Sequence, residues 1–142
     1  MARRSVSRLE GFREASRQLN EMSKAVARNV GKRALTDTAE ILARGVRANV
    51  APHNLTGDTY ESVDVEPAKQ KGGVAVQVVL ADIAGVQLEF GNSDQTATPV
   101  FRPAVDSNRR KMDDTFAVLL PLEIDAAVIR KAKRAARKAP KG

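Results

Sequence analysis

The sequence predicts an α+β fold in which long N-terminal helices and C-terminal helices pack on a small antiparallel sheet. Apolar residues recur at helical spacing over residues 9–50 and again from Pro103 onward, which is typical of amphipathic helices. Between these regions, Val63 and Val65 before Gly72-Gly73, and Val74, Val76, Val78 and Leu80 after it, recur with a period of two, which indicates an antiparallel hairpin. Of the 142 residues 42% are hydrophobic, which is enough for the core of a single domain over 1–142.

The N-terminal helical pattern falls into two series, which predicts two helices or one kinked helix. Gly31 lies between the series and is the expected position of the bend, because glycine weakens a helix interior. Pro52 is expected to end the second series. Residues 1–33 are expected to form an extended basic helical arm, because they are rich in Arg, Ser and Gln. The helix over 34–50 has the wider apolar stripe of a core element.

The central region is predicted to hold one helical turn followed by the hairpin. Asp58 and Glu61 have the spacing of a capping box, so a short helix is expected to start after the bend at Gly57. The hairpin is expected over 61–80. The segment 99–102 is a candidate third strand.

A second short helix is predicted to end at Gly91, because glycine suits the left-handed residue that closes a helix. Asp82 is expected to cap its first turn. The apolar residues at helical spacing in this segment are Ile83, Val86 and Phe90. Residues 92–98 are polar or small and have no apolar period, so they are expected to form a projecting loop.

The last third of the chain is predicted to be helical and to begin at Pro103, because proline is a good first helical residue. Pro121 is expected to interrupt the helix, so that a second helical segment follows it. The core is expected to span 34–129. A basic C-terminal tail is expected over 130–142.

Charge is distributed unevenly along the chain. Residues 1–33 carry nine basic and three acidic side chains, residues 34–129 carry eight and fourteen, and residues 130–142 carry seven and none. This layout suits electrostatic docking of the ends of one copy on the middle of another, or on an acidic partner. The alternative is that the charges simply solvate helix faces. The candidate docking or DNA-contacting residues of the tail are Arg130, Lys131, Lys133, Arg134, Arg137 and Lys138.

The composition excludes several classes of protein. There is no cysteine, so neither disulfides nor a thiolate metal site can form. No apolar run approaches the ~20 residues that span a bilayer, and the N-terminal residues lack the apolar core of a signal peptide. We therefore expect synthesis in the cytoplasm and no membrane partner.

The chain offers little for catalysis, and we expect no catalytic site, no metal site and no cofactor. His53, the only histidine, lies in a predicted turn, where a surface role is favoured. Asp58, Glu61 and Asp64 form an acidic cluster, but helix capping accounts for two of them without a cation. A hydrolase that uses Asp58, Glu61 and Glu89 is the least favoured alternative, because no nucleophile and base stand at a recognisable spacing.

Three sequence elements follow one another along the chain. The first is Asn54-Leu55-Thr56-Gly57 with 60–63, the second is Leu88-Glu89-Phe90-Gly91, and the third is Pro99-Val100-Phe101-Arg102-Pro103-Ala104. In this order, with helices between them, the chain resembles the small neck and tail-completion proteins of long-tailed bacteriophages. Those proteins lie at or near the joint between the DNA-filled head and the tail.

The resemblance implies a non-enzymatic structural protein of the virion neck, assembled in the host cytoplasm. Its implied partners are copies of itself in a ring of about six or twelve, connector proteins on the portal side, and the tail terminator or tail tube protein. Nonspecific contact with packaged DNA stays open. The alternative function is that of a basic, nonspecific nucleic-acid-binding protein, although the tail lacks the interleaved aromatic residues that stack on bases.

Candidate subunit or partner contacts lie in the second element, the loop after it and the third element. These residues are Leu88, Glu89, Phe90, Gly91, Asn92, Ser93, Asp94, Gln95, Phe101 and Arg102. The Glu89 carboxylate is expected to accept backbone N–H groups or to pair with Arg102, with an exposed glutamate as the alternative. Phe101 is expected to anchor the core rather than to contact a partner.

Overall fold

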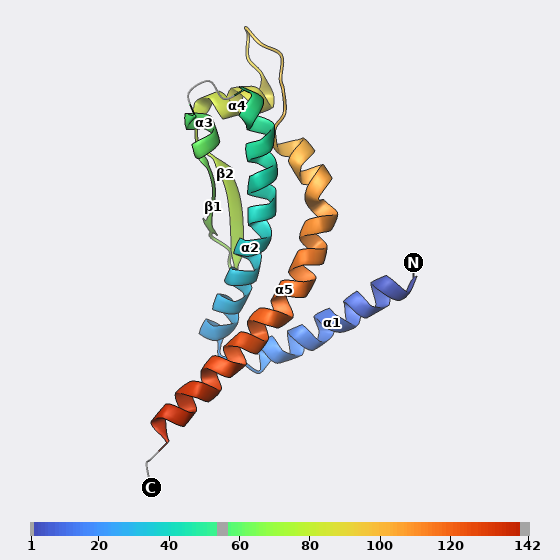
Figure 1. The fold of residues 1–142 in the computed structure, drawn as a ribbon, viewed down its shortest axis with the longest axis vertical. Helices are drawn as coiled ribbons and strands as arrows, with labels where there is room; N and C mark the ends of the chain where they lie inside the picture. The colour runs from blue at the N-terminus through green and yellow to red at the C-terminus, as the bar shows by residue number, and fades with distance from the viewer. Residues whose placement is uncertain (1, 54–56, 140–142) are drawn as a thin grey trace.

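The structure, a computed structural model, describes residues 2–53 and 57–139, with side chains from Gly11 onward. The molecule is elongated, and the sheet is a hairpin beside long helices, which confirms the predicted α+β class (Figure 1). In chain order the elements are α1 (Ala2–Asn20), α2 (Lys24–Val50), the 3-10 turn η1 (Ala51–His53), α3 (Asp58–Glu61), β1 (Val63–Ala68), β2 (Ala75–Leu80), α4 (Ile83–Phe90) and α5 (Phe101–Lys138). Asn54, Leu55 and Thr56 of the first sequence element, and residues 140–142 of the predicted basic tail, lie outside the described residues.

The N-terminal helical region is divided at 21–23 and not at Gly31. Ser23 is the N-cap of α2, and its hydroxyl oxygen accepts a hydrogen bond from the backbone nitrogen of Val26. α2 then continues through Gly31. The predicted bend at this glycine is therefore wrong. One helical glycine costs about 1 kcal/mol, whereas burial of a side chain such as Val30, which is fully buried, stabilises by about 1.5–3 kcal/mol.

β1 and β2 form an antiparallel pair with Val63 opposite Leu80, which confirms the predicted hairpin. Gly72 has the positive φ of +74° that its tight turn requires. The candidate third strand at 99–102 is wrong, because the described residues hold a sheet of two strands and α5 begins at Phe101.

α2 is the central layer of the fold. The hairpin lies along one side of α2 and α5 lies along another (Figure 1). Gly45 allows the close approach of α2 to α5, because a β-carbon at this position would lie 3.3 Å from that of Ala104. Two separate apolar clusters result, one near the hairpin and one near α1. The hairpin cluster is Ala43, Val46, Val50, Val63, Val100 and Ala104. The α1 cluster is Ala15, Val30, Ala34, Leu120, Ile124 and Ala127.

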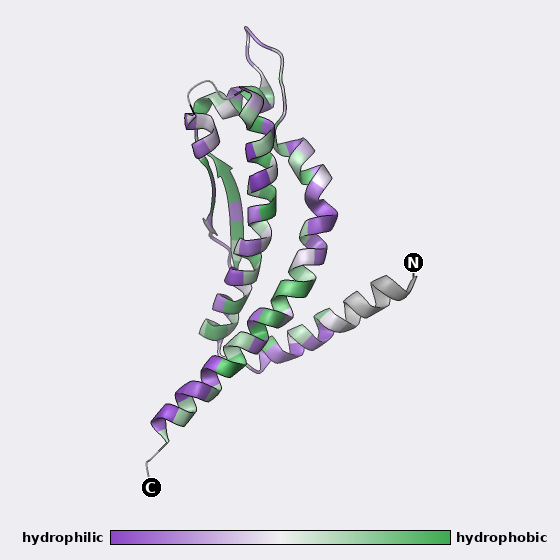
Figure 2. Cartoon of the chain, in the orientation of Figure 1, coloured by the Kyte–Doolittle hydropathy of each residue, from purple (hydrophilic) through white to green (hydrophobic). Residues whose placement is uncertain are grey.

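α5 is one helix of 38 residues with Pro121 inside it, so the predicted interruption at this proline is wrong. Leu120 and Ile124 are buried against α1 and α2 on either side of Pro121. This burial keeps the segment helical, although proline removes one backbone hydrogen bond. Figure 1 shows that α5 bends in its middle, as helices do near an internal proline. Polar residues dominate its last turns (Figure 2).

Two smaller predictions concern the caps of α3 and α4. α3 begins at Asp58 with Gly57, at φ +87°, in the N-cap position, so the predicted capping box with Asp58 as the cap is wrong. Pro52 lies in η1 directly after α2, as predicted, and Gly91 follows α4 with φ +73°. Over the described ranges, the structure has no helix with the length and apolar character needed to cross a membrane.

Candidate functional site

The short helix α4 stands at one end of the molecule, below the projecting loop (Figure 1). Its first turn is attached to α3, because Asp82 accepts a hydrogen bond from the Thr59 hydroxyl at 2.5 Å. The backbone nitrogen of Asp82 also donates to the hydroxyl oxygen of Ser62 at 3.3 Å. Asp82 occupies the N-cap position of α4. Its side chain binds the Thr59 hydroxyl of α3 and makes no hydrogen bond to an α4 amide. The helix is therefore positioned by contacts outside itself.

Glu89 joins the last turn of α4 to the start of α5. Its Oε2 accepts hydrogen bonds from the backbone nitrogens of Val100, at 2.6 Å, and Phe101, at 2.8 Å. Its Oε1 lies 3.6 Å from Nε of Arg102. Both parts of the predicted interaction are thus observed. The amides are the closer partners, and the Arg102 side chain is 71% exposed while that of Glu89 is 9% exposed. The carboxylate caps α5, whose own N-cap residue makes no side-chain cap.

The loop over 92–98 has a closed base and a folded tip. The amide of Thr98 donates to the carbonyl of Leu88 at 2.7 Å, which closes the base. At the tip, the side-chain oxygen of Asn92 accepts from the amides of Asp94 and Gln95, at 2.8 and 2.9 Å. All seven residues are exposed. The predicted loop therefore projects as a shaped turn.

The structure separates the candidate contact residues into two groups. Leu88 and Phe101 pack against the hairpin cluster and Glu89 is buried, so these side chains build the base. The remaining members of the α4 and loop group lie at the surface or at the turn. Phe90 is 71% exposed, and 92–95 are exposed along the loop. Phe101 occupies the core position expected for it.

Sequence reasoning identified Phe90 as a candidate contact but missed Ile83 and Val86, which lie beside it on the exposed apolar face of α4. The three side chains are 72% (Ile83), 48% (Val86) and 71% (Phe90) exposed. The buried side of α4 is instead formed by Gly85 and Glu89. The sequence signal that could have identified this surface is that a glycine and a glutamate lie on the side of the helix away from the three apolar residues. We call Ile83, Val86, Phe90 and the loop 92–98 the α4 tip.

The α4 tip carries acidic charge and no basic charge. From Gly72 to Phe101 the chain holds three acidic residues and no Lys or Arg. Two of them are engaged within the fold, Asp82 with Thr59 and Glu89 with the α5 amides. The third, Asp94, is exposed on the loop.

A hollow of about 550 Å³ lies toward the other end of the molecule, between the junction of α1 with α2 and the later part of α5. Apolar residues of this lining are Met22, Val26, Ala127 and Val128. Basic residues of the lining are Arg33, Arg130, Lys131 and Arg134. We call this hollow the basic groove. Three of the six candidate cations of the tail, Arg130, Lys131 and Arg134, line this groove. The other three, Lys133, Arg137 and Lys138, lie outside its lining.

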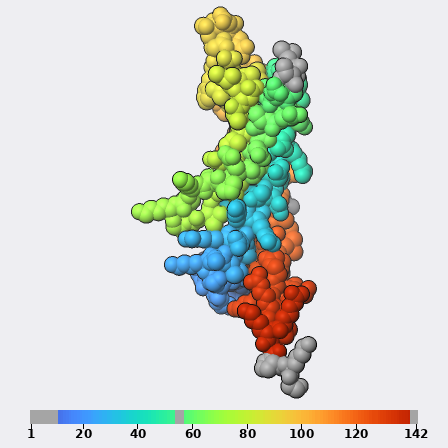
Figure 3. Space-filling model, turned by 90° about the vertical axis from the view of Figure 1, so that its left-hand side faces the viewer, coloured from blue at the N-terminus to red at the C-terminus, as the bar shows by residue number. Residues whose placement is uncertain are grey.

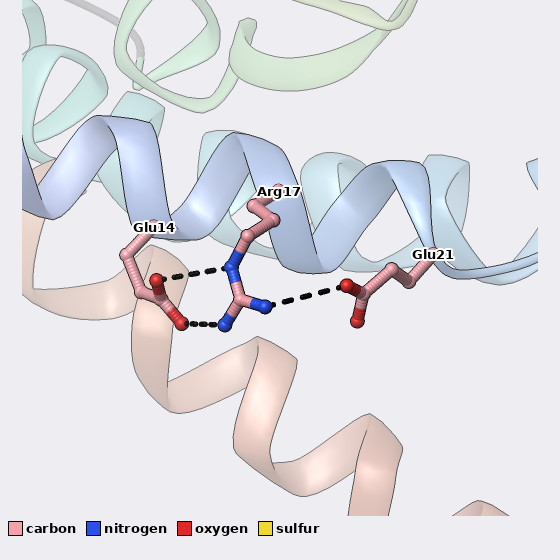
Figure 4. Close-up of polar contacts among 3 residues, drawn as sticks. All are labelled: Glu14, Arg17 and Glu21. Carbon is pink, nitrogen blue, oxygen red and sulfur yellow. Dashed lines mark hydrogen bonds and ion pairs between the residues drawn. The ribbon is translucent and has the colours of Figure 1, made fainter.

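The glutamates near the basic groove do not cancel its positive charge. Arg17 hydrogen bonds to Glu14 at 2.5 Å and lies 3.4 Å from Glu21, a lining residue (Figure 4). The hydrogen bond with Arg17 lowers the pKa of Glu14 below its usual value, and Glu14 in turn raises the pKa of Arg17. Glu21 is the one carboxylate among the lining residues, and it lies beside Arg17. The lining therefore holds more basic than acidic side chains.

No group of three or more His, Cys, Asp or Glu side chains in the described ranges is arranged to hold a metal ion. His53 is exposed in η1. What the described surface does offer is an acidic apolar tip and a basic apolar groove. Comparison of the chain with protein-family models, with curated proteins and with solved structures found no match.

Proposed function

We propose that the chain is a structural subunit of the neck of a long-tailed bacteriophage. It forms a ring at the junction of head and tail and bridges the connector on the head side to the tail terminator or tail tube. The order of the three sequence elements supports this proposal, since two of them, at 88–91 and 99–104, are joined in space by Glu89. In this function the protein acts by binding other proteins in the virion, after synthesis in the host cytoplasm.

The exposed apolar face of α4 is the observation that carries the proposal. Single exposed hydrophobic side chains are normal on a protein surface. Three on one face of an eight-residue helix, beside a loop that projects from the body, form a surface suited to another protein. The carboxylate of Glu89 and the bond from Thr98 to Leu88 hold this surface in shape before any partner binds.

Disruption of the gene in the phage genome that carries it tests the proposal. We expect DNA-filled heads and separate tails by electron microscopy, with joined particles restored when the wild-type chain is supplied in trans. Antibody labelling should place the protein at the neck of the restored particles. Joined, infectious particles in the absence of the gene would refute the proposal.

A variant refines this test without removing the protein. Replacement of residues 93–97 by five glycine and serine residues keeps Asn92 and Thr98. The hydrogen bond that closes the loop base, from the Thr98 amide to the Leu88 carbonyl, is therefore kept. We expect a folded protein by circular dichroism but few joined particles. Lys69→Ser, in the exposed hairpin turn, is the control and should support normal joining.

The alternative of nonspecific nucleic-acid binding is supported by the exposed cations of the last turns of α5. Residues 131–139 are all exposed, and they include five Lys or Arg side chains. Fluorescence anisotropy with random duplex DNA over a salt series tests this alternative. Tight binding by the isolated protein that falls steeply with salt would favour it over the neck function.

A further inference from the structure

We infer that the α4 tip of one copy of the chain seats in the basic groove of a second copy, so that copies join head to tail. This inference rests on the proposed function, because it names the two surfaces that would make the neck ring.

The basic groove selects an occupant that is apolar and acidic. Its apolar lining includes Val128, which is 51% exposed, and Met22 and Val26. Exposure of these apolar side chains to water is unfavourable, so their burial against another apolar group would stabilise a complex. The four cations of the lining favour an acidic occupant and disfavour a basic one.

The α4 tip has this combination of properties. Its apolar stripe offers Phe90 and Ile83, each more than 70% exposed, as side chains that can fill a hollow. Asp94 stands exposed on the adjoining loop, and no Lys or Arg occurs between Lys71 and Arg102. An apolar surface beside one exposed carboxylate, Asp94, is thus complementary to an apolar hollow lined by four cations.

One chain cannot make this contact with itself. The α4 tip and the later part of α5 lie at opposite ends of the elongated molecule, as Figures 1 and 3 show. An α4 tip that fills the groove therefore belongs to another copy of the chain. When two different surfaces of the same chain meet, the contact is heterologous, and its repetition closes a ring if the rotation between copies allows it.

Charge also argues against symmetric pairing of either surface. Two α4 tips placed together would bring Asp94 toward the Asp94 of the other copy, and the nearest basic residue along the chain, Arg102, lies at the loop base beside Glu89. Two basic grooves placed together would oppose Arg130, Lys131 and Arg134 with the same cations. Like charges across an interface are unfavourable, so the head-to-tail arrangement is the complementary one.

Sedimentation velocity of the full chain gives the first test. We expect concentration-dependent self-association that weakens as salt increases. Phe90→Ser and Arg134→Glu should each weaken it by roughly tenfold or more, as expected for an interface anchor and for reversal of a complementary charge. Lys131→Glu provides a second groove variant. Leu122→Ser is the matched control, because Leu122 is 57% exposed on α5 but lies outside the basic groove.

A mixing experiment tests the head-to-tail geometry directly. Phe90→Ser keeps an intact groove, and Arg134→Glu keeps an intact α4 tip. At a concentration where the wild-type chain associates, we expect each variant alone to be mainly monomeric and the mixture to form a pair of one copy of each. Absence of the pair, or a wild-type chain that stays monomeric at every concentration, would overturn the inference. Equal loss of association in Leu122→Ser would overturn it too.

The outcomes separate this inference from the proposed function. A mixed pair together with normal particles after gene disruption would leave the contact standing and refute the neck function. A monomeric chain together with a joining defect after gene disruption would refute the contact and leave the neck function standing.

Discussion

Glu89 lies with its Oε2 2.6 Å from the backbone nitrogen of Val100, so a side chain that precedes the projecting loop caps the helix that follows it. The carbonyl of Val100 is held as well, by the Asn49 side chain at 3.0 Å. Val100 is fully buried, and both of its backbone polar groups therefore need these partners. The loop between the two residues is thus fixed at its base by the fold.

Removal of the Glu89 carboxylate should destabilise the protein. We expect Glu89→Ala to lower the free energy of unfolding by about 1–3 kcal/mol, because two amides at the start of α5 lose their acceptor. Glu89→Gln should cost less, because one oxygen remains. Urea denaturation followed by circular dichroism measures both changes.

Arg102→Ala is the control for this prediction. Its guanidinium is largely exposed and 3.6 Å from Glu89, so we expect a change within about 0.5 kcal/mol. An equal loss in Arg102→Ala and Glu89→Ala would show that the ion pair, and not the amide contacts, stabilises the loop base.

Two glycines should respond to alanine in opposite directions. Gly91 has φ +73° and ψ 178°, and an added β-carbon would lie 2.8 Å from the backbone nitrogen of Ala97. We expect Gly91→Ala to destabilise by about 1–3 kcal/mol. Gly31 lies inside α2 with nothing within 4 Å of the new carbon. Gly31→Ala should stabilise by about 0.5–1 kcal/mol. Thermal unfolding of the two variants gives the comparison, and a stabilising Gly91→Ala would contradict the backbone geometry.

Gly85 should be coupled to Leu80. A β-carbon at Gly85 would overlap Cδ2 of Leu80, so Gly85→Ala forces this side chain to move and should destabilise by about 1–3 kcal/mol. In the Leu80→Ala background the added methyl group finds space, and its cost should be much smaller. A double-mutant cycle from urea denaturation measures the coupling. Additive effects would mean that the two residues do not share this space.

The carboxyl group of Glu14 should titrate below its usual value, because the Arg17 hydrogen bond favours the charged form. A lowered pKa in the folded chain means that the stabilisation is present above the unfolded pKa and is lost as pH falls through the folded pKa. Both side chains are more than half exposed, so the stabilisation is small. An NMR pH titration should find the pKa of Glu14 raised by Arg17→Gln. An unchanged pKa in that variant would contradict the contact.

The secondary-structure predictions that held were local in origin, whereas the predicted contact of Glu89 with backbone amides joins the end of α4 to the start of α5. The alternation on both sides of Gly72 predicted the hairpin, and Pro52 and Gly91 marked the ends of their helices. The helix breaks predicted at Gly31 and Pro121 failed because packing competes there with a local preference. Pro121 stays helical because Leu120 and Ile124 are buried beside it.

By itself the sequence determined the order of helices and hairpin, the alternation of basic and acidic regions, and the position of the projecting loop. These follow from residue periodicity, from glycine and proline geometry and from charge, which act over a few neighbouring residues. Only the tertiary structure decided that the apolar stripe of α4 faces outward, and that Arg33 joins Arg130 and Arg134 around one groove. Both depend on contacts between residues far apart in the chain, because burial of Glu89 against α5 and of α5 against α1 and α2 sets which faces are left to solvent.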